Sequence, residues 1–252
     1  MNNNFKKFVN YGKGNKKTLL IFIIFTLFIS PVVAANNVSD AIQLYNEGKY
    51  QETISNLVTY LNDNNEDYTA YYYLGLSYLK MNEYQMAINA FKNARNIKDN
   101  EYKVYMNLGR AYYNNNNIDK ALEVLNQARD MENNDDQVYN LLGLIYLDQD
   151  YKKAISNFKK AHDLDKDNYY VLNNLGYAYI LQGEYEEAVQ YLEEAVSHNP
   201  DVSYIYNNLG ISYENLGQLK QAKKYYEMAL EVNPDYQKAL TNLNRIENKQ
   251  DN

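Results

Sequence analysis

Residues 172–200 read LNNLGYAYILQGEYEEAVQYLEEAVSHNP, and residues 206–234 repeat this pattern as YNNLGISYENLGQLKQAKKYYEMALEVNP. The motif Leu-Gly, with Tyr three residues after Gly, occurs five times in the chain. Its glycines are Gly75, Gly109, Gly143, Gly176 and Gly210. They are spaced 34, 34, 33 and 34 residues apart. A fixed period of this length indicates a stacked repeat array rather than a closed globule.

A second pattern follows each glycine. The pattern consists of a small residue, a large residue four positions later and an Ala three positions after that. This spacing places one apolar stripe on a helix. The first small residues are Ala87, Ala121, Ala154, Ala188 and Ala222; the large ones are Phe91, Leu125, Phe158, Leu192 and Tyr226. Each unit is therefore predicted to contain two helices, with the Gly of the first facing the first Ala of the second.

Helix ends are marked by Gly and Pro. Gly183 and Gly217 fall where the helix hairpin should turn, and Pro200 and Pro234 fall just after the second helix. Both residue types are typical of helix termini.

Together these residues resemble the tetratricopeptide repeat. The resemblance implies an all-α, right-handed α-solenoid of stacked helix-turn-helix units. In place of the family's usual Trp the chain has Tyr71, Tyr105, Tyr139, Leu172 and Tyr206, and in place of Pro the first three full units have Asp99, Asn133 and Lys166. One residue is missing between Tyr146 and Ala154, which should shorten the hairpin turn at 148–150.

The pattern divides the chain into successive units. Five repeats are expected at 68–101, 102–135, 136–168, 169–202 and 203–236, preceded by a degenerate first repeat at 36–67. Residues 237–252 are expected to form a capping helix and a polar tail, with Leu240, Leu243 and Ile246 on one stripe. Such a cap keeps the last apolar face of an array from water.

Residues 1–35 are of a different kind. Five lysines precede an apolar run of 11 residues at 19–29, which is followed by small residues up to Ala35. This order is typical of an export signal, and the run is shorter than the ~20 residues of a membrane-spanning helix. We expect a cleaved signal peptide rather than a retained membrane anchor, and an exported bacterial protein whose repeats lie outside the cytoplasmic membrane.

No catalytic or metal-binding set is evident. The chain has no Cys, and its only histidines, His162 and His198, lack companion ligands. Asp163, Asp165 and Asp167 have the alternating spacing of a calcium loop without its central Gly and closing Glu. We therefore expect no enzyme activity, no cofactor and no metal.

The charge of the repeat region excludes two classes of ligand. Without the five leader lysines, 20 Lys and Arg stand against 32 Asp and Glu, a formal charge of -12. An acidic domain is repelled by nucleic acid and by anionic lipid, so neither is expected as a partner, and the membrane is contacted only through the N-terminal segment if it is uncleaved.

The resemblance also implies a groove. In this family the second, fifth, sixth, ninth and twelfth positions of each unit face inward. These positions give Tyr72, Leu76, Asn107, Arg110, Tyr113, Asn140, Leu144, Leu147, Tyr170, Asn173, Asn174, Tyr177, Ile180, Tyr204, Asn207, Asn208 and Ile211. Asn can hydrogen-bond a peptide backbone, and Tyr gives rigid contact area. The basic residues with which some family members clamp a terminal carboxylate are missing, and Arg110 is the only cation of the set.

Asn107, Asn174 and Asn208 share the sixth position and resemble an asparagine ladder that holds a peptide main chain. The alternative is that Asn is simply frequent in this sequence. Because Ala is the better helix former, replacing the three by Ala is not expected to lower stability.

The sequence thus predicts a non-catalytic protein-protein interaction scaffold or assembly factor that binds an extended peptide or partner protein in the groove. Two alternatives stay open. One is a self-assembling homo-oligomer, docked through apolar surface near Val38 and Ile42. The other is a non-catalytic subunit of an envelope or cell-wall enzyme complex.

Overall fold

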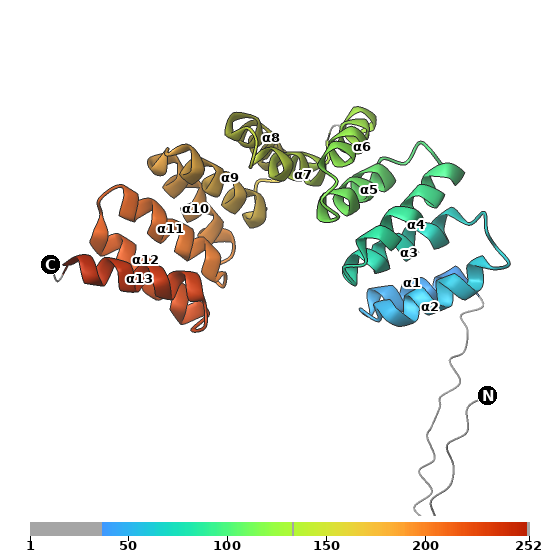
Figure 1. Ribbon diagram of the computed structural model, residues 1–252, viewed down its shortest axis with the longest axis horizontal. Coiled ribbons are helices and arrows are strands. Elements are labelled where there is room, and N and C mark those ends of the chain that lie inside the picture. Colours follow the sequence, from blue (N-terminus) through green and yellow to red (C-terminus); the bar gives the residue numbers. More distant parts are fainter. Residues whose placement is uncertain (1–36, 133, 251–252) are drawn as a thin grey trace, which may run out of the picture. The chain divides into compact units, whose positions relative to one another are not determined.

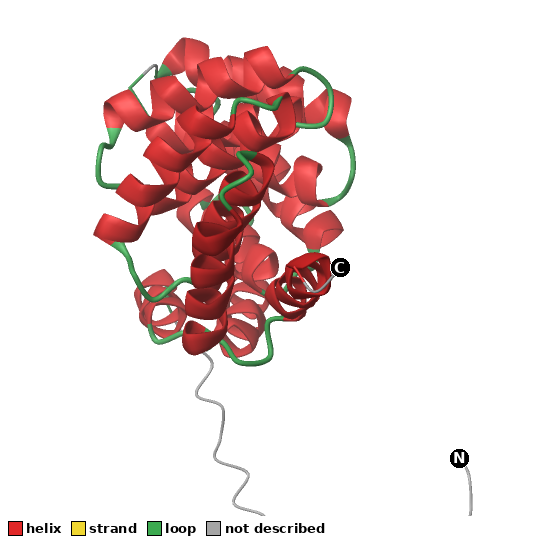
Figure 2. Cartoon of the chain, turned by 90° about the vertical axis from the view of Figure 1, so that its left-hand side faces the viewer, coloured by secondary structure: helices red, strands yellow, loops and turns green. Residues whose placement is uncertain are grey.

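The computed structural model describes residues 37–132 and 134–250, and within them it contains thirteen α-helices and no strand (Figures 1 and 2). Their bounds are α1 Val38–Asn46, α2 Tyr50–Leu61, α3 Tyr68–Lys80, α4 Tyr84–Ile97, α5 Tyr102–Asn114, α6 Ile118–Met131, α7 Asp136–Tyr146, α8 Tyr151–Leu164, α9 Tyr169–Gln182, α10 Tyr185–His198, α11 Ser203–Asn215, α12 Leu219–Val232 and α13 Gln237–Gln250.

The helices form six hairpins followed by α13. Each helix packs on the next along the chain, and the first helices of neighbouring hairpins also adjoin, as α9 does with α11 and α5 with α7. We call the surface formed by the first helices and α13 the inner face, and that of the second helices the outer face. The predicted all-α solenoid of stacked helix pairs is confirmed.

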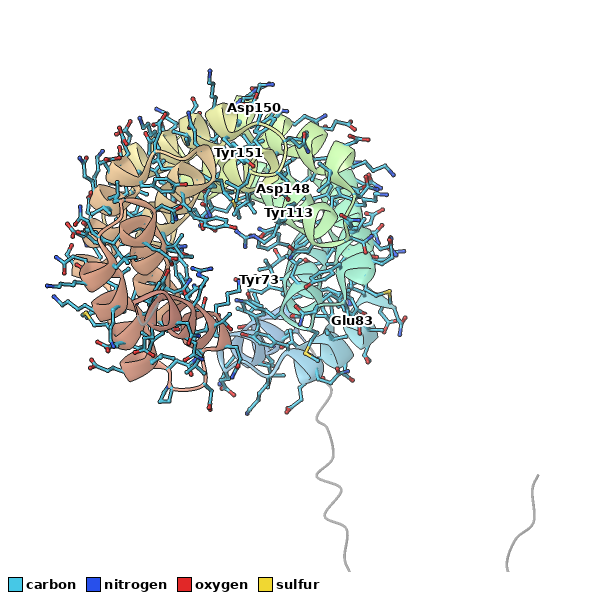
Figure 3. The ribbon with its side chains drawn as sticks, turned by 60° about the vertical axis from the view of Figure 1, so that its left-hand side comes forward. Tyr73, Glu83, Tyr113, Asp148, Asp150 and Tyr151 are labelled. Carbon is cyan, nitrogen blue, oxygen red and sulfur yellow. The ribbon has the colours of Figure 1, made fainter. Side chains whose placement is uncertain are left out.

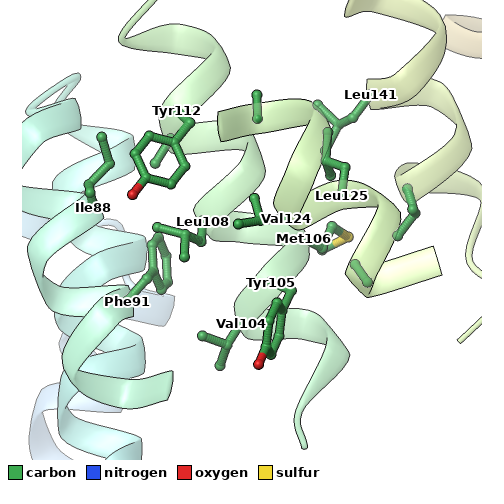
Figure 4. Packing of buried hydrophobic residues seen from close by; sticks show 14 of the residues in the cluster. Ile88, Phe91, Val104, Tyr105, Met106, Leu108, Tyr112, Val124, Leu125 and Leu141 are labelled. Atoms are coloured by element: carbon green, nitrogen blue, oxygen red, sulfur yellow. The ribbon is translucent and has the colours of Figure 1, made fainter. Parts of the chain in front are cut away.

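The predicted stripe of the second helices forms the core. Its first Ala, its large residue and its second Ala are fully buried in all five full units, as Ala87, Phe91 and Ala94 are in α4. Figure 4 shows Phe91 among Ile88, Leu108 and other buried side chains of neighbouring helices.

The partner predicted for the repeated glycines is correct only in part. A Cβ added at Gly75 would lie 2.6 Å from Phe91, and one at Gly109 or Gly143 would lie 2.5 Å from Leu125 or Phe158. The glycine thus makes room chiefly for the large residue of the second helix, and at Gly176 the carbonyl oxygen of the first Ala, Ala188, also lies near, at 3.3 Å from an added Cβ. The reason is the length of the large side chain, which crosses the hairpin to reach the first helix.

The hairpin turns use a left-handed residue, as expected at Gly183 (φ 85°) and Gly217 (φ 74°). In the second and third hairpins Asn82 (φ 61°) and Asn116 (φ 57°) have the same conformation, which Asn tolerates better than other side chains do. The sequence analysis overlooked both.

The missing residue of the fourth unit shortens a helix rather than a turn. α7 has 11 residues and ends at Tyr146, whereas α5 and α11 have 13. The connection at 147–150 is not shortened, and its Asp150 N–H donates to the Tyr146 carbonyl at 2.7 Å. The predicted shorter turn is therefore wrong: α7 is two residues shorter than α5 and α11, and Asp150 caps α8 after the connection.

The apolar core is divided into two clusters at the fourth hairpin. One large cluster of buried residues runs from Ala87 to Ile145, and the next begins at Ala154 and runs to Ala239. Leu144 and Tyr146 of α7, and Leu147 directly after it, pack on the second cluster. The two clusters therefore meet inside the fourth hairpin.

α13 closes the array. Ile246 is fully buried, and Leu243 packs beside it as the predicted stripe requires. Two ion pairs fasten the helix: Lys223 Nζ to Glu247 Oε1 at 2.6 Å and Arg245 Nη2 to Glu214 Oε2 at 2.5 Å.

At the other end, Val38 packs on the core cluster of the first hairpin, which includes Ala41, Ile54 and Leu57. Val38 and Ile42 are both partly buried. Part of the surface of Val38 is thus covered within the hairpin itself, and the homo-oligomer alternative stays a prediction.

The predicted N-terminal segment 1–35 lies outside the described residues. Of the helices that the structure does describe, none has the length and apolar character required to cross a membrane.

Candidate functional site

The inner face contains a hollow at the middle of the array, which we call the central hollow. Its volume is about 490 Å³, and it lies between α5, α7 and α9. It brings together six of the predicted groove residues: Arg110, Tyr113, Asn140, Leu144, Tyr170 and Asn174. Because apolar and amide groups alternate in its lining, it can contact both the side chains and the main chain of an extended peptide.

A second hollow adjoins the first. This adjacent hollow, of about 230 Å³, is lined by Tyr45, Leu76, Leu79, Lys80, Arg110 and Asn114. Arg110 and Asn114 line both hollows, so the two adjoin each other at these residues. A third hollow, of about 390 Å³ between α11 and α13, includes the predicted Asn207 and Ile211.

The remaining predicted residues lie outside these three hollows, on the first helices or, for Leu147, directly after α7: Tyr72, Asn107, Leu147, Asn173, Tyr177, Ile180, Tyr204 and Asn208. Tyr177 is well exposed, whereas Asn107 is only 2% exposed. Figure 3 shows Tyr73 and Tyr113 on the inner side of the helices and Asp150 and Tyr151 toward the outer side.

The asparagines of the inner face bond one another across neighbouring hairpins. Asn174 Nδ2 donates to Asn140 Oδ1, Asn208 Nδ2 to Asn173 Oδ1, and Asn242 Nδ2 to Asn207 Oδ1, each at 3.0 Å. We call these three bonds the amide ladder. It links α7 to α9, α9 to α11 and α11 to α13.

Asn107 takes part in a different contact. Its Nδ2 donates to the Lys103 carbonyl at 2.8 Å and to the Tyr72 hydroxyl at 3.2 Å. The sequence analysis expected that Ala in place of these asparagines would leave stability unchanged. That expectation is corrected, because each amide bonds a neighbouring hairpin and such a bond contributes ~0.5–1.5 kcal/mol.

Burial changes the acidity of two inner-face tyrosines. It raises the pKa of Tyr72 from 10.0 to about 12, and it raises that of Tyr204 equally, with neighbouring tyrosines adding to both effects. Both hydroxyls are therefore neutral at physiological pH and act as hydrogen-bond donors or acceptors.

These raised pKa values predict a loss of stability in alkali. Above pH 10 the unfolded chain loses the tyrosine protons before the folded chain does, so the free energy of unfolding should fall between pH 10 and about pH 12. Denaturant unfolding measured at a series of pH values should show a shallower fall for Tyr72→Phe and Tyr204→Phe than for the wild type. Tyr151→Phe, on the outer face, is the matched control, and equal slopes in all four proteins would contradict the prediction.

Sequence reasoning missed several residues of the hollows. Asp136 and Asn168 lie where α7 and α9 begin, and Asn114 and Lys80 lie at the ends of α5 and α3. The family register does not include these helix ends, although their polarity was a usable signal. Lys80 also corrects the prediction that Arg110 is the only cation of this face.

Stacked helix hairpins with an open inner face of Asn, Tyr and Leu define the class of α-solenoid scaffolds that bind other proteins. Within this class the chain belongs to the tetratricopeptide-repeat family: the family model of the C-terminal domain of cilia and flagella-associated protein 70 matches residues 32–233. A sequence search of curated proteins finds no match.

Solved structures share the fold at low identity. The Cut9–Hcn1 hetero-tetramer of the APC/C matches with a TM-score of 0.76 and 20% identity, covering 86% of this chain and 43% of that chain. YrrB, a tetratricopeptide-repeat protein with an unusual peptide-binding site, matches with a TM-score of 0.59 and 18% identity, covering 73% and 96%. Pseudomonas aeruginosa pilF matches at 0.70 and 16%, covering 81% and 93%. The chain thus spans less than half the length of the Cut9–Hcn1 chain that it matches.

Proposed function

We propose that this protein is a non-catalytic scaffold that binds an extended segment of a partner protein along its inner face. The observation that carries the proposal is the pair of adjoining hollows that both have Arg110 in their lining. Their combined lining offers Leu and Tyr surface for side chains and asparagine amides for a main chain.

Two further features support this function. Tyr170 is 56% exposed although its ring is large and partly apolar, and such exposed aromatic area is typical of protein-binding surfaces. The fold is shared with YrrB, which is described as having an unusual peptide-binding site.

A photo-crosslinking amino acid placed at two tyrosines tests the proposal. Tyr170 lies on the inner face in α9, and Tyr151, also exposed at 40%, lies on the outer face at the start of α8. We expect the Tyr170 position to crosslink a specific protein in cells, identified by mass spectrometry, and the Tyr151 position not to. The same partner captured at both positions, or at Tyr151 alone, would refute inner-face binding.

The proposed location is outside the cytoplasmic membrane, as the export-signal pattern of residues 1–35 suggests. Replacing Ala35 with Gln should block signal cleavage and leave a membrane-bound form about 35 residues longer, because the peptidase requires a small residue there. Immunoblots of membrane and soluble fractions measure this. Equal membrane-bound masses for both proteins would instead indicate a retained anchor.

A further inference from the structure

The Arg110 guanidinium has more hydrogen-bond donors than the surrounding residues supply acceptors. Its guanidinium has five N–H donors, and the structure gives it one acceptor, the neutral Gln137 Oε1 at 2.9 Å from Nη2. The side chain is partly buried, and burial lowers the pKa of its guanidinium. A cation removed from water favours an anionic partner.

Two carboxylates at the start of α7 accept hydrogen bonds from other groups, and the charge of one of them, Asp135, partly offsets the lowering of the Arg110 pKa by burial. Asp135 Oδ1 accepts the N–H of Gln137 at 2.9 Å, and its Oδ2 accepts the Tyr102 hydroxyl at 3.2 Å. Asp136 Oδ2 accepts from Asn168 Nδ2 at 2.9 Å. No ion pair joins Arg110 to an Asp or Glu within residues 37–132 and 134–250.

The two hollows beside Arg110 differ in charge. The central hollow has Asp136 in its lining. The adjacent hollow has Lys80 as well as Arg110, and no Asp or Glu among the described residues that line it. In a repeat region with a formal charge of -12, this hollow is a local site of positive charge.

The walls of the adjacent hollow fit a carboxylate on a short stem. Tyr45, Leu76 and Leu79 provide apolar contact beside the two cations. Apolar walls exclude water, and this strengthens a charge-assisted hydrogen bond to Arg110.

We propose that the adjacent hollow binds the carboxylate of an Asp or Glu side chain of an extended peptide, with Arg110 and Lys80 as its cations. The inference rests on the proposed function and specifies its ligand. Because Arg110 and Asn114 line both hollows, a chain bound in both of them passes Arg110 on its way into the central hollow. An internal acidic side chain, rather than a chain terminus, therefore supplies the carboxylate.

The test uses a mixed library of octapeptides, half with acetylated and amidated ends and half with free carboxyl termini. The library is passed over the immobilised full-length chain, and retained peptides are sequenced by mass spectrometry. We expect enrichment of Asp or Glu at one internal position of the end-blocked peptides. The best of these peptides is then labelled, and its Kd is measured by fluorescence anisotropy.

Arg110→Gln should remove the preference for acidic peptides and raise the Kd of the labelled peptide by about tenfold or more, because a charge-assisted hydrogen bond is lost. Arg110→Lys keeps the charge and should retain part of the preference. Arg129→Gln on α6, where Arg129 forms an ion pair with Asp130, is the outer-face control and should not change the Kd. Thermal melts of each variant confirm folding.

The remaining outcomes separate the two claims. Retained peptides without an acidic preference would overturn this inference and leave the proposed function standing. Retention only of peptides with free carboxyl termini would also overturn the inference, because the bound carboxylate would then belong to a chain terminus. No retained peptide at all would overturn the proposed function and the inference with it.

Discussion

Replacing Gly176 with Leu should lower the free energy of unfolding by ~1–3 kcal/mol, the usual cost of overpacking a core. A Cβ at this position would lie 2.5 Å from Leu192 Cγ and 3.3 Å from the Ala188 carbonyl oxygen. Leu192 is fully buried, so it has no free space into which to move. Thermal melts followed by circular dichroism should show a decrease in Tm of several degrees.

The close contact with Leu192 can be isolated by a double-mutant cycle. Gly176→Ala and Leu192→Ala should each destabilise the protein, but together they should cost less than the sum, because the second change removes the atoms that the first one meets. Gly183→Ala is the control for backbone effects: nothing lies within 4 Å of its added Cβ, yet its φ of 85° disfavours Ala. Strictly additive losses for Gly176 and Leu192 would show that the two residues do not compete for space.

Replacing Asn107, Asn174 and Asn208 together with Ala should weaken the binding of the crosslinked partner. If each amide bonds the peptide main chain at ~0.5–1.5 kcal/mol, the loss is ~1.5–4.5 kcal/mol, or roughly ten- to two-thousandfold. Asn107 and Asn208 are 2% and 9% exposed, and Asn174 lines the central hollow. We therefore expect the lower end of this range, with most of the loss due to Asn174.

Calorimetry with the purified partner measures this effect. A matched triple variant at Asn89, Asn93 and Asn96, which are exposed on the outer face of α4, should bind normally. The inner-face variant should also melt earlier, since two of its amides belong to the ladder and the third bonds Tyr72. An unchanged Kd in the folded variant would place the binding site away from these asparagines.

The sequence predicts the fold well because a repeat presents the same evidence several times. Five copies of Leu-Gly and of the Ala stripe identify both helices of each hairpin, and the buried Ala188 and Leu192 are in the predicted places. The closer contact of Gly176 with Leu192 could not be predicted. It depends on how far a side chain reaches across the hairpin, and the spacing of residues along one helix does not give that distance.

The binding surface was predicted only in part. Register identifies inner-face positions such as Asn140, Asn174 and Arg110, but it does not show that Asn140 and Asn174 bond each other. Nor does it bring Lys80 of α3 beside Arg110 of α5, because that pairing depends on the stacking of successive hairpins. Residues at helix ends are the general gap, since a repeat pattern fixes helix interiors better than termini.

The short α7 bears on where the array is expected to open first under tension or heat. Two apolar clusters meet in the fourth hairpin, where α7 is two residues shorter than α5 and α11. An array of nearest-neighbour interfaces opens first at its weakest joint, so α7 is the expected boundary between an N-terminal and a C-terminal folding block. The central hollow spans this boundary, with Arg110 on one side and Tyr170 on the other. A ligand bound in the central hollow would contact both blocks and would stabilise them against separation under tension or heat.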